Sequence, residues 1–480
     1  MYDSENTAND GYQKIDSLQR ILSSLNLKVK TVSQNDYYKG LLNKKYIGVI
    51  SLINWPQVGL TNKSFLQDRQ KFRGIKLHIG DNLTVSEAKE LGGSATKIYQ
   101  QQLILNFQGN KQLLPFSETA TVLSHLSKGT RKIGLLTSQQ KNQSKYTYGV
   151  IYKKVGFLPY FKKSGVSLMA AVKTIAELFG SKGNYRPLLA ITGVSPYSNL
   201  KVLDEISNYC YQKNIPFSIS TVTVSENTEM KAYRHFTKVL KKVEERNGII
   251  FLNTPAVGGA GTNSAAELNE RMTASFVAFA NHQVYPVGIS SQGYWNQDEV
   301  LRKQALMQAD HWLLLPSETP TFVKQDNNAN VAHQSLYAVS ASSLLTAQQK
   351  SGLKFEIPTA ITYKLPDSSK KLFDFKRLVQ SLHVTWFDPV LQNWQTKVSS
   401  NTTTIEYKGG NYFLNGQRKE LSSKASGSLR TSPQNKFRPL FTRFFSLQGN
   451  ILMLFFAIAL SILLVFIGLG RRIYLQMFKR

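Results

Sequence analysis

Histidine and carboxylate side chains most often hold catalytic metal ions or move protons, and this chain contains seven histidines. No two of them lie at the close spacing that places both on one helix face or one strand end. Asp310–His311 is the single acid–histidine neighbour pair, and adjacent side chains point in different directions on a helix or strand. We interpret this pair as ordinary surface or core chemistry, and we expect neither a metal site nor a cofactor.

Other residue types that could support catalysis have structural explanations. The single cysteine, Cys210, recurs with apolar neighbours at helical spacing, which predicts a small core residue rather than a nucleophile. The glycines of Gly258–Thr262 lack the lysine and spacing of a phosphate-binding loop, so we expect a flexible loop there. Glu226 and Asp298–Glu299 are the acids to check for a glycosidase, although no paired-acid signature surrounds them.

Several aromatic, amide and hydroxyl side chains follow predicted strand ends and could hold a neutral sugar. Such groups are what carbohydrate binding uses, because a sugar presents both apolar faces and hydroxyls. An equally weighted alternative is that the aromatic rings pack against the fold. The candidate glycan-binding residues are Tyr197, Asn253, Thr254, Tyr294 and Trp295.

The elements that would position these residues form a strand–loop–helix–strand unit. The apolar run Leu188–Ile191 predicts a buried strand, and Gly193–Pro196 breaks it where ligand-binding loops begin. Apolar residues at helical spacing follow from Leu200 to Cys210, and a second strand is predicted at Phe217–Val224. Ligands in such folds meet the carboxyl ends of the strands.

The same alternation of strand and helix continues along the chain. Strands are predicted at Gly248–Leu252, Val284–Ile289 and His311–Leu315, and helices at Ala265–Asn281 and Asn296–Asp310. The pattern predicts an α/β fold with a distorted (β/α) barrel over residues 165–350.

Three segments of this barrel resemble a bacterial family of membrane-anchored, uncharacterised polysaccharide-deacetylase-like proteins, distantly similar to carbohydrate esterase family four. They are Ile191–Pro196, Gly248–Val257 and Pro286–Tyr294. The resemblance implies paired aspartates in the first segment and histidines in the other two, and this chain has none of them there. Deacetylation by that route needs a metal-bound water and a carboxylate base, so the resemblance implies a fold with degenerate catalytic motifs, a pseudoenzyme.

The remaining regions divide by composition. Residues 1–164 predict a flavodoxin-like open-sheet α/β domain with a β-rich insert, and residues 351–420 predict a basic β-rich region. The Ser/Gly-rich residues 421–448 predict a linker. Ile451–Gly470 is an uncharged apolar run of about the length of a transmembrane helix. Residues 471–480 are basic, which favours a cytoplasmic tail and an extracytoplasmic bulk of the chain.

That topology requires an export signal, and the first residues show no basic segment followed by an apolar one. They are typical instead of the end of a strand and an amphipathic helix through Ile15, Leu18, Ile21 and Leu22. We therefore expect a signal sequence and the apolar half of a first strand upstream of Met1. A tail-anchored protein facing the cytoplasm is the alternative.

The chain carries a formal net charge of +29. This charge favours polyanionic partners such as wall polymers, acidic polysaccharide or lipid head groups, and no nucleic-acid-binding motif accompanies it. We favour a non-catalytic glycan-binding protein of the cell surface, accessory to exopolysaccharide synthesis, modification or export. An active deacetylase or hydrolase with relocated residues and a scaffold for a membrane glycosyltransferase complex are the alternatives.

Overall fold

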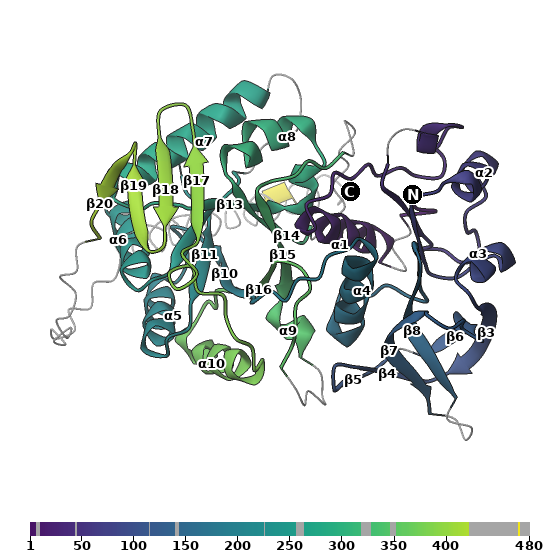
Figure 1. Cartoon of the computed structure of the whole chain (residues 1–480). Coiled ribbons are helices and arrows are strands. Elements are labelled where there is room, and N and C mark those ends of the chain that lie inside the picture. The colour runs from purple at the N-terminus through teal and green to yellow at the C-terminus, as the bar shows by residue number, and fades with distance from the viewer. Residues whose placement is uncertain are drawn as a thin grey trace, which may run out of the picture. The chain divides into compact units, whose positions relative to one another are not determined.

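The computed structural model describes residues 1–5, 10–43, 46–114, 116–139, 144–224, 226–255, 264–317, 328–345, 352–421 and 469–470. The chain divides into two compact units, Met1–Ser422 and Ser423–Arg480. The helices and strands of the first unit are shown in Figure 1.

A closed barrel of seven parallel strands lies at the centre of the first unit. Each strand pairs with the next along the chain, and the last pairs back to the first. The strands are β10 (Leu188–Val194), β11 (Phe217–Thr221), β12 (Ile249–Asn253), β13 (Gly288–Gln292), β14 (His311–Leu315), β15 (Gln334–Ser340) and β16 (Thr359–Lys364). Leu189, Ala190 and Ile191 are fully buried, as expected where helices cover a parallel sheet. The predicted α/β class and parallel barrel are therefore confirmed.

The closing strand β16 lies beyond residue 350, within the region that the sequence assigned to a basic β-rich segment. Its first residues, Thr359, Ala360 and Ile361, form a short buried run. The run fills the gap between β15 and β10, because a parallel barrel leaves no strand edge unpaired.

Helices cover the outside of the barrel between most successive strands. They are α5 (Leu200–Gln212), α6 (Lys231–Glu245), α7 (Ser264–Asn281), α8 (Glu299–Gln304) and α9 (Ala341–Leu344), with 3₁₀ turns η3 (Gly293–Asn296) and η4 (Leu306–Gln308). In α6 the buried residues include Tyr233, Phe236 and Leu240, at the three- and four-residue spacing of an apolar helix face.

The amino-terminal helix α1 (Gly11–Ser24) packs against β15 (Figure 1). Ser17 Oγ lies 2.8 Å from Tyr337 Oη, and Arg20 donates a 2.8 Å hydrogen bond to the Ala338 carbonyl. The described part of the connection between β14 and β15 contains no helix. Helix α1 thus occupies a place on the barrel that a crossover helix would normally take.

The amino-terminal region forms a seven-stranded mixed sheet, with strand order β1-β2-β9-β8-β7-β4-β5. Its strands are β1 (Gly48–Leu52), β2 (Ile75–Ile79), β4 (Leu103–Phe107), β5 (Asn110–Leu113), β7 (Arg131–Ser138), β8 (Lys145–Tyr152) and β9 (Val155–Leu158). Strands β1, β2 and β9 are parallel, and the others pair antiparallel. Strands β3 (Ser94–Gln101) and β6 (Ser117–Ser124) form a separate two-stranded antiparallel sheet. The helices of this region are η2 (Leu41–Asn43), α2 (Lys63–Lys71), α3 (Val85–Glu90) and α4 (Gly165–Leu178).

A four-stranded antiparallel sheet follows the barrel in sequence and attaches to its amino-terminal end. It comprises β17 (Gln395–Ser399), β18 (Thr404–Lys408), β19 (Asn411–Leu414) and β20 (Gln417–Lys419), after η5 (Ser369–Lys371) and α10 (Leu372–Ser381). Thr396 Oγ1 donates to the Val287 carbonyl at 2.9 Å, and the Asp310 amide donates to the Lys397 carbonyl at 2.9 Å. Val287 and Asp310 directly precede β13 and β14, so these bonds fix the sheet to that end of the barrel.

No helix within the described ranges is long and apolar enough to cross a bilayer. The apolar run Ile451–Gly470 lies outside the described residues except for Leu469 and Gly470, as do the linker and the basic tail from residue 422 onward. The membrane anchor therefore stays a prediction.

Candidate functional site

The loop after β10 stands where the sequence led us to expect ligand-binding residues. The pairing of β10 with β11 is irregular between Ile191 and Val194, and Gly193 has a positive φ of 73°. Ser198 Oγ accepts a hydrogen bond from the Ser195 amide at 2.9 Å and donates to the Gly193 carbonyl at 3.1 Å. The loop is thus stabilised by its own hydroxyl groups.

The second and third segments of the resemblance also end barrel strands. Asn253 is the last residue of β12 and lies opposite Ser290 of β13, and the Thr254 amide donates to the Ser290 carbonyl at 3.0 Å. Gln292 is the last residue of β13. Thr192, Asn253 and Gln292 supply no carboxylate or imidazole, so these positions do not fit a catalytic divalent metal. Within the described residues, no group of three or more His, Cys, Asp or Glu side chains could hold a metal ion.

The aromatic candidates at this end of the barrel differ in exposure. Tyr197 is 89% exposed and lines a hollow of about 460 Å³ with Asn199, Pro366 and their neighbours. Trp295 is only 3% exposed and packs in the barrel core, with its ring centroid 6.2 Å from that of Tyr294. Burial raises the pKa of Tyr294. The glycan role of Tyr197, Asn253, Thr254, Tyr294 and Trp295 stays a prediction.

Asp298 and Glu299, two of the acids that the sequence marked for inspection, make contacts at a helix end and at the protein surface. Asp298 is fully buried and caps α8, where its Oδ1 accepts the Leu301 amide at 2.8 Å. Glu299 is exposed and pairs with Lys303, which lowers the pKa of Glu299. These contacts show how the two acids are used as helix-end and surface groups.

A polar cavity of about 570 Å³ lies at the opposite, amino-terminal end of the barrel strands. His311 begins β14, and His333 directly precedes β15. Tyr185 and the residues that lead into β17 complete one side of the cavity. Its polar and aromatic lining residues include Tyr185, His311, His333, Gln334, Gln392, Asn393, Trp394 and Gln395.

Two nitrogen atoms of this lining are buried without a hydrogen-bond partner among the described residues. They are His311 Nδ1 and Trp394 Nε1. The His311 ring centroid lies 4.5 Å from that of Trp394 and 5.5 Å from that of His333. Burial, together with the nearby His333, lowers the pKa of His311 to about 3, so this imidazole is neutral near pH 7.

Sequence reasoning missed this cavity. It noted Asp310–His311 and treated the pair as ordinary, whereas the structure shows His311 at 2% exposure with an unpaired nitrogen. The available signal was that two histidines stand at the beginnings of consecutive strands, which in a parallel barrel lie at the same end. Trp394 gave no signal, because it comes from a segment beyond the barrel.

No protein-family model and no curated protein matches this chain. Among solved structures, it is similar to a family 4 carbohydrate esterase from Streptomyces lividans in complex with acetate, with a TM-score of 0.26 and 11% identity. That match covers 42% of this chain and 89% of the esterase. A phospho-2-dehydro-3-deoxyheptonate aldolase from Thermotoga maritima matches with a TM-score of 0.24 and 8% identity, over 59% of this chain and 86% of the aldolase. At these scores neither similarity assigns an activity to this chain.

Proposed function

We propose that this protein is a non-catalytic, deacetylase-like protein that binds glycan at the cell surface, accessory to exopolysaccharide synthesis, modification or export. The proposal places the bulk of the chain outside the cytoplasm, anchored by Ile451–Gly470. Its single strongest support is the polar cavity at the amino-terminal end of the barrel, because this cavity combines aromatic rings, amides and unpaired buried nitrogens.

The chemistry of the cavity suits a neutral sugar. Tyr185 and Trp394 offer ring faces for the apolar side of a sugar, and Gln392, Asn393 and Gln395 offer amides for its hydroxyls. A hydroxyl that pairs with the indole N–H of Trp394 would relieve a buried unpaired group, which contributes about 1–3 kcal/mol. These features support binding of an uncharged part of a polysaccharide.

The non-catalytic part of the proposal rests on residue chemistry at the carboxyl end of the barrel. Hydrolysis of an acetamide needs an activated water and a group that accepts its proton. The hydroxyl of Thr192 and the amides of Asn253 and Gln292 do neither at neutral pH. The net charge of +29 adds a general attraction between the protein and anionic polymers of the cell surface.

A glycan array with the detergent-solubilised full chain tests this function. We expect binding to one or a few polysaccharides that persists in a metal chelator. Metal-dependent acetate release from acetylated oligosaccharides would overturn the non-catalytic proposal in favour of an active hydrolase. Absence of any glycan binding, with co-purification of a membrane glycosyltransferase, would favour the scaffold instead.

Two tyrosine variants then locate the site on the barrel. Tyr185→Ala removes a ring from the amino-terminal cavity, and Tyr197→Ala removes a ring from the carboxyl-terminal hollow. We expect Tyr185→Ala to weaken glycan binding by about tenfold and Tyr197→Ala to leave it unchanged. The opposite order would place the glycan at the predicted residues around Tyr197. Both tyrosines are exposed, at 37% and 89%, so neither change empties the core.

A further inference from the structure

The first residues of the chain lie inside the amino-terminal sheet rather than on its surface. Met1 donates from its amino group to the Ile50 carbonyl at 3.1 Å, and the Leu52 amide donates to the Met1 carbonyl at 3.0 Å. On the other side, the Tyr2 amide donates to the Val32 carbonyl at 3.2 Å, and the Tyr2 carbonyl accepts from Gln34 at 2.9 Å. Tyr2 forms parallel bridges to both neighbours. Met1 and Tyr2 therefore form a short parallel strand segment, which we call the rung, between β1 and the segment that contains Val32.

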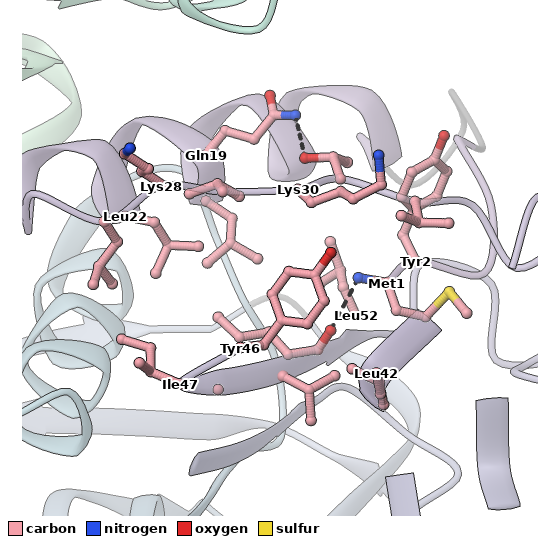
Figure 2. A pocket seen from close by; sticks show the side chains of 18 of the residues that line it. Met1, Tyr2, Gln19, Leu22, Lys28, Lys30, Leu42, Tyr46, Ile47 and Leu52 are labelled. Atoms are coloured by element: carbon pink, nitrogen blue, oxygen red, sulfur yellow. Dashed lines mark hydrogen bonds between the residues drawn. The ribbon is translucent and has the colours of Figure 1, made fainter. Parts of the chain in front are cut away.

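An apolar cavity of about 470 Å³ continues this rung beyond the amino group of Met1. Figure 2 shows the cavity with Lys28 and Lys30 on one side and Ile47 and Leu52 on the other. Two backbone segments, Lys28–Val32 and Tyr46–Ile50, line it along their lengths. The cavity is therefore bordered by the same two chain segments that hold Met1 and Tyr2 in place.

The backbone direction in both segments points hydrogen-bonding groups toward this space. Successive residues of a strand direct their N–H and C=O groups to alternate sides. Since Ile50 uses its carbonyl for Met1, its amide and the groups of Gly48 face the same side of β1. Since Val29 accepts from Ala329 on the far side, at 2.7 Å, the groups of Lys30 face the cavity.

Apolar side chains close the cavity above and below. Leu18 and Leu22 of α1 line one face, and Leu41, Leu42 and Phe65 line the other. A strand buried on both faces is typically an unbroken apolar run. The amino group of Met1 is itself buried, which lowers its pKa to about 5. A peptide N–H at that position would carry no charge and would keep the bond to Ile50.

We propose that this cavity is a strand slot, filled by a short apolar segment that directly precedes Met1 and extends the rung as a parallel β-strand. The bridge register places about four residues of this segment beside Ile47–Ile50 on one side and Lys28–Thr31 on the other. A lipid or other apolar ligand would contact the apolar lining but would form no hydrogen bonds with the backbone N–H and C=O groups of the two segments. A strand contacts the lining and also forms these hydrogen bonds. The slot is independent of the proposed glycan function.

Matched amino-terminal extensions of the full chain test the slot. One variant adds alternating valine and isoleucine before Met1, and the control adds a glycine–serine segment of the same length. We expect the apolar extension alone to raise the urea midpoint of unfolding. We also expect hydrogen exchange at the amides of Lys30, Val32 and Ile50 to slow by at least about tenfold, because these amides face the slot.

The hydrogen-exchange pattern distinguishes a strand in the cavity from other occupants. Equal exchange at these three amides in both variants would refute the strand slot. Protection of the unextended chain by vesicle lipid, with no further gain from the apolar extension, would also refute it and assign the cavity to an apolar ligand. A third variant with proline in the apolar extension removes a backbone donor, and we expect it to lose most of the protection.

Discussion

His311 gives the most quantitative prediction, because its burial couples folding to acid. Its pKa is lowered from 6.5 to about 3 in the folded chain. Between these values the unfolded chain binds a proton that the folded chain does not, so stability is fully present above pH 6.5 and falls as the pH drops toward 3. The linkage relation gives a loss of about 2 kcal/mol in the free energy of unfolding between about pH 8 and pH 5 from this group alone.

The substitution His311→Gln removes the titration and keeps a polar side chain. We expect the loss of unfolding free energy between the two pH values to be smaller in this variant than in the natural chain by about 2 kcal/mol. Urea unfolding followed by tryptophan fluorescence measures it, since the ring of Trp394 lies against His311. His235→Gln, at an exposed position of α6, is the matched control. Identical pH dependence in the natural chain and His311→Gln would refute the reasoning, whatever the stability of the variant at one pH.

Three further predictions concern buried polar groups. Arg20→Met leaves Asp16 buried without the guanidinium that lies 2.9 Å from it, and should lower the free energy of unfolding by about 3–5 kcal/mol. The double variant Asp16→Asn with Arg20→Met should recover part of this loss, as measured by urea unfolding. Burial raises the pKa of Glu244 well above 4.5. The contribution of this group to the free energy of unfolding is therefore fully present below pH 4.5 and is lost as the pH rises through the pKa of the folded chain. In urea unfolding at several pH values, Glu244→Gln should reduce this loss. Burial raises the pKa of the Cys210 thiol to about 12, so a thiol reagent should label it only after unfolding, and rapid labelling of the native chain would contradict this.

Several of the barrel strands were predictable, because a buried parallel strand is a short apolar run in the sequence, whereas β15 and β16 were not predicted. The predicted strand His311–Leu315 coincides with β14, and the predicted strand Gly248–Leu252 lies within one residue of β12 at both ends. Each is a short run in which most residues are buried on both faces. Helix α7 was predicted to within one residue, at Ala265–Asn281 against Ser264–Asn281.

Elements whose positions depend on distant contacts were not predicted. The β-rich insert predicted within residues 1–164 carried no sheet assignment, and the structure places its consecutive strands β3 and β4 in different sheets. Val284–Ile289 was expected as a strand, yet β13 begins only at Gly288. Val284 and Val287 are buried there, so their apolar character reflects core packing rather than strand pairing.

The polar cavity could not be predicted from the sequence, because it also depends on contacts between distant segments of the chain. His311 and His333 come from neighbouring strands, but Trp394 and Gln395 reach the cavity only because the β17 sheet binds the amino-terminal end of the barrel. No local pattern in the sequence encodes that attachment. The loops at the carboxyl end were easier to identify, since every strand of a parallel barrel ends there.

The position of α1 on the barrel sets an order for folding. Ser17 and Tyr337 lie 320 residues apart in the chain, so α1 leaves the ribosome long before the strand that it covers. Until β15 is made, the side of α1 that carries Ser17 and Arg20 lacks this partner, and nascent chains with such exposed surfaces are prone to aggregate. Contacts of this sequence separation also slow folding, because a long loop must close before they form. The contacts between α1 and β15 therefore form late, after most of the chain has been synthesised.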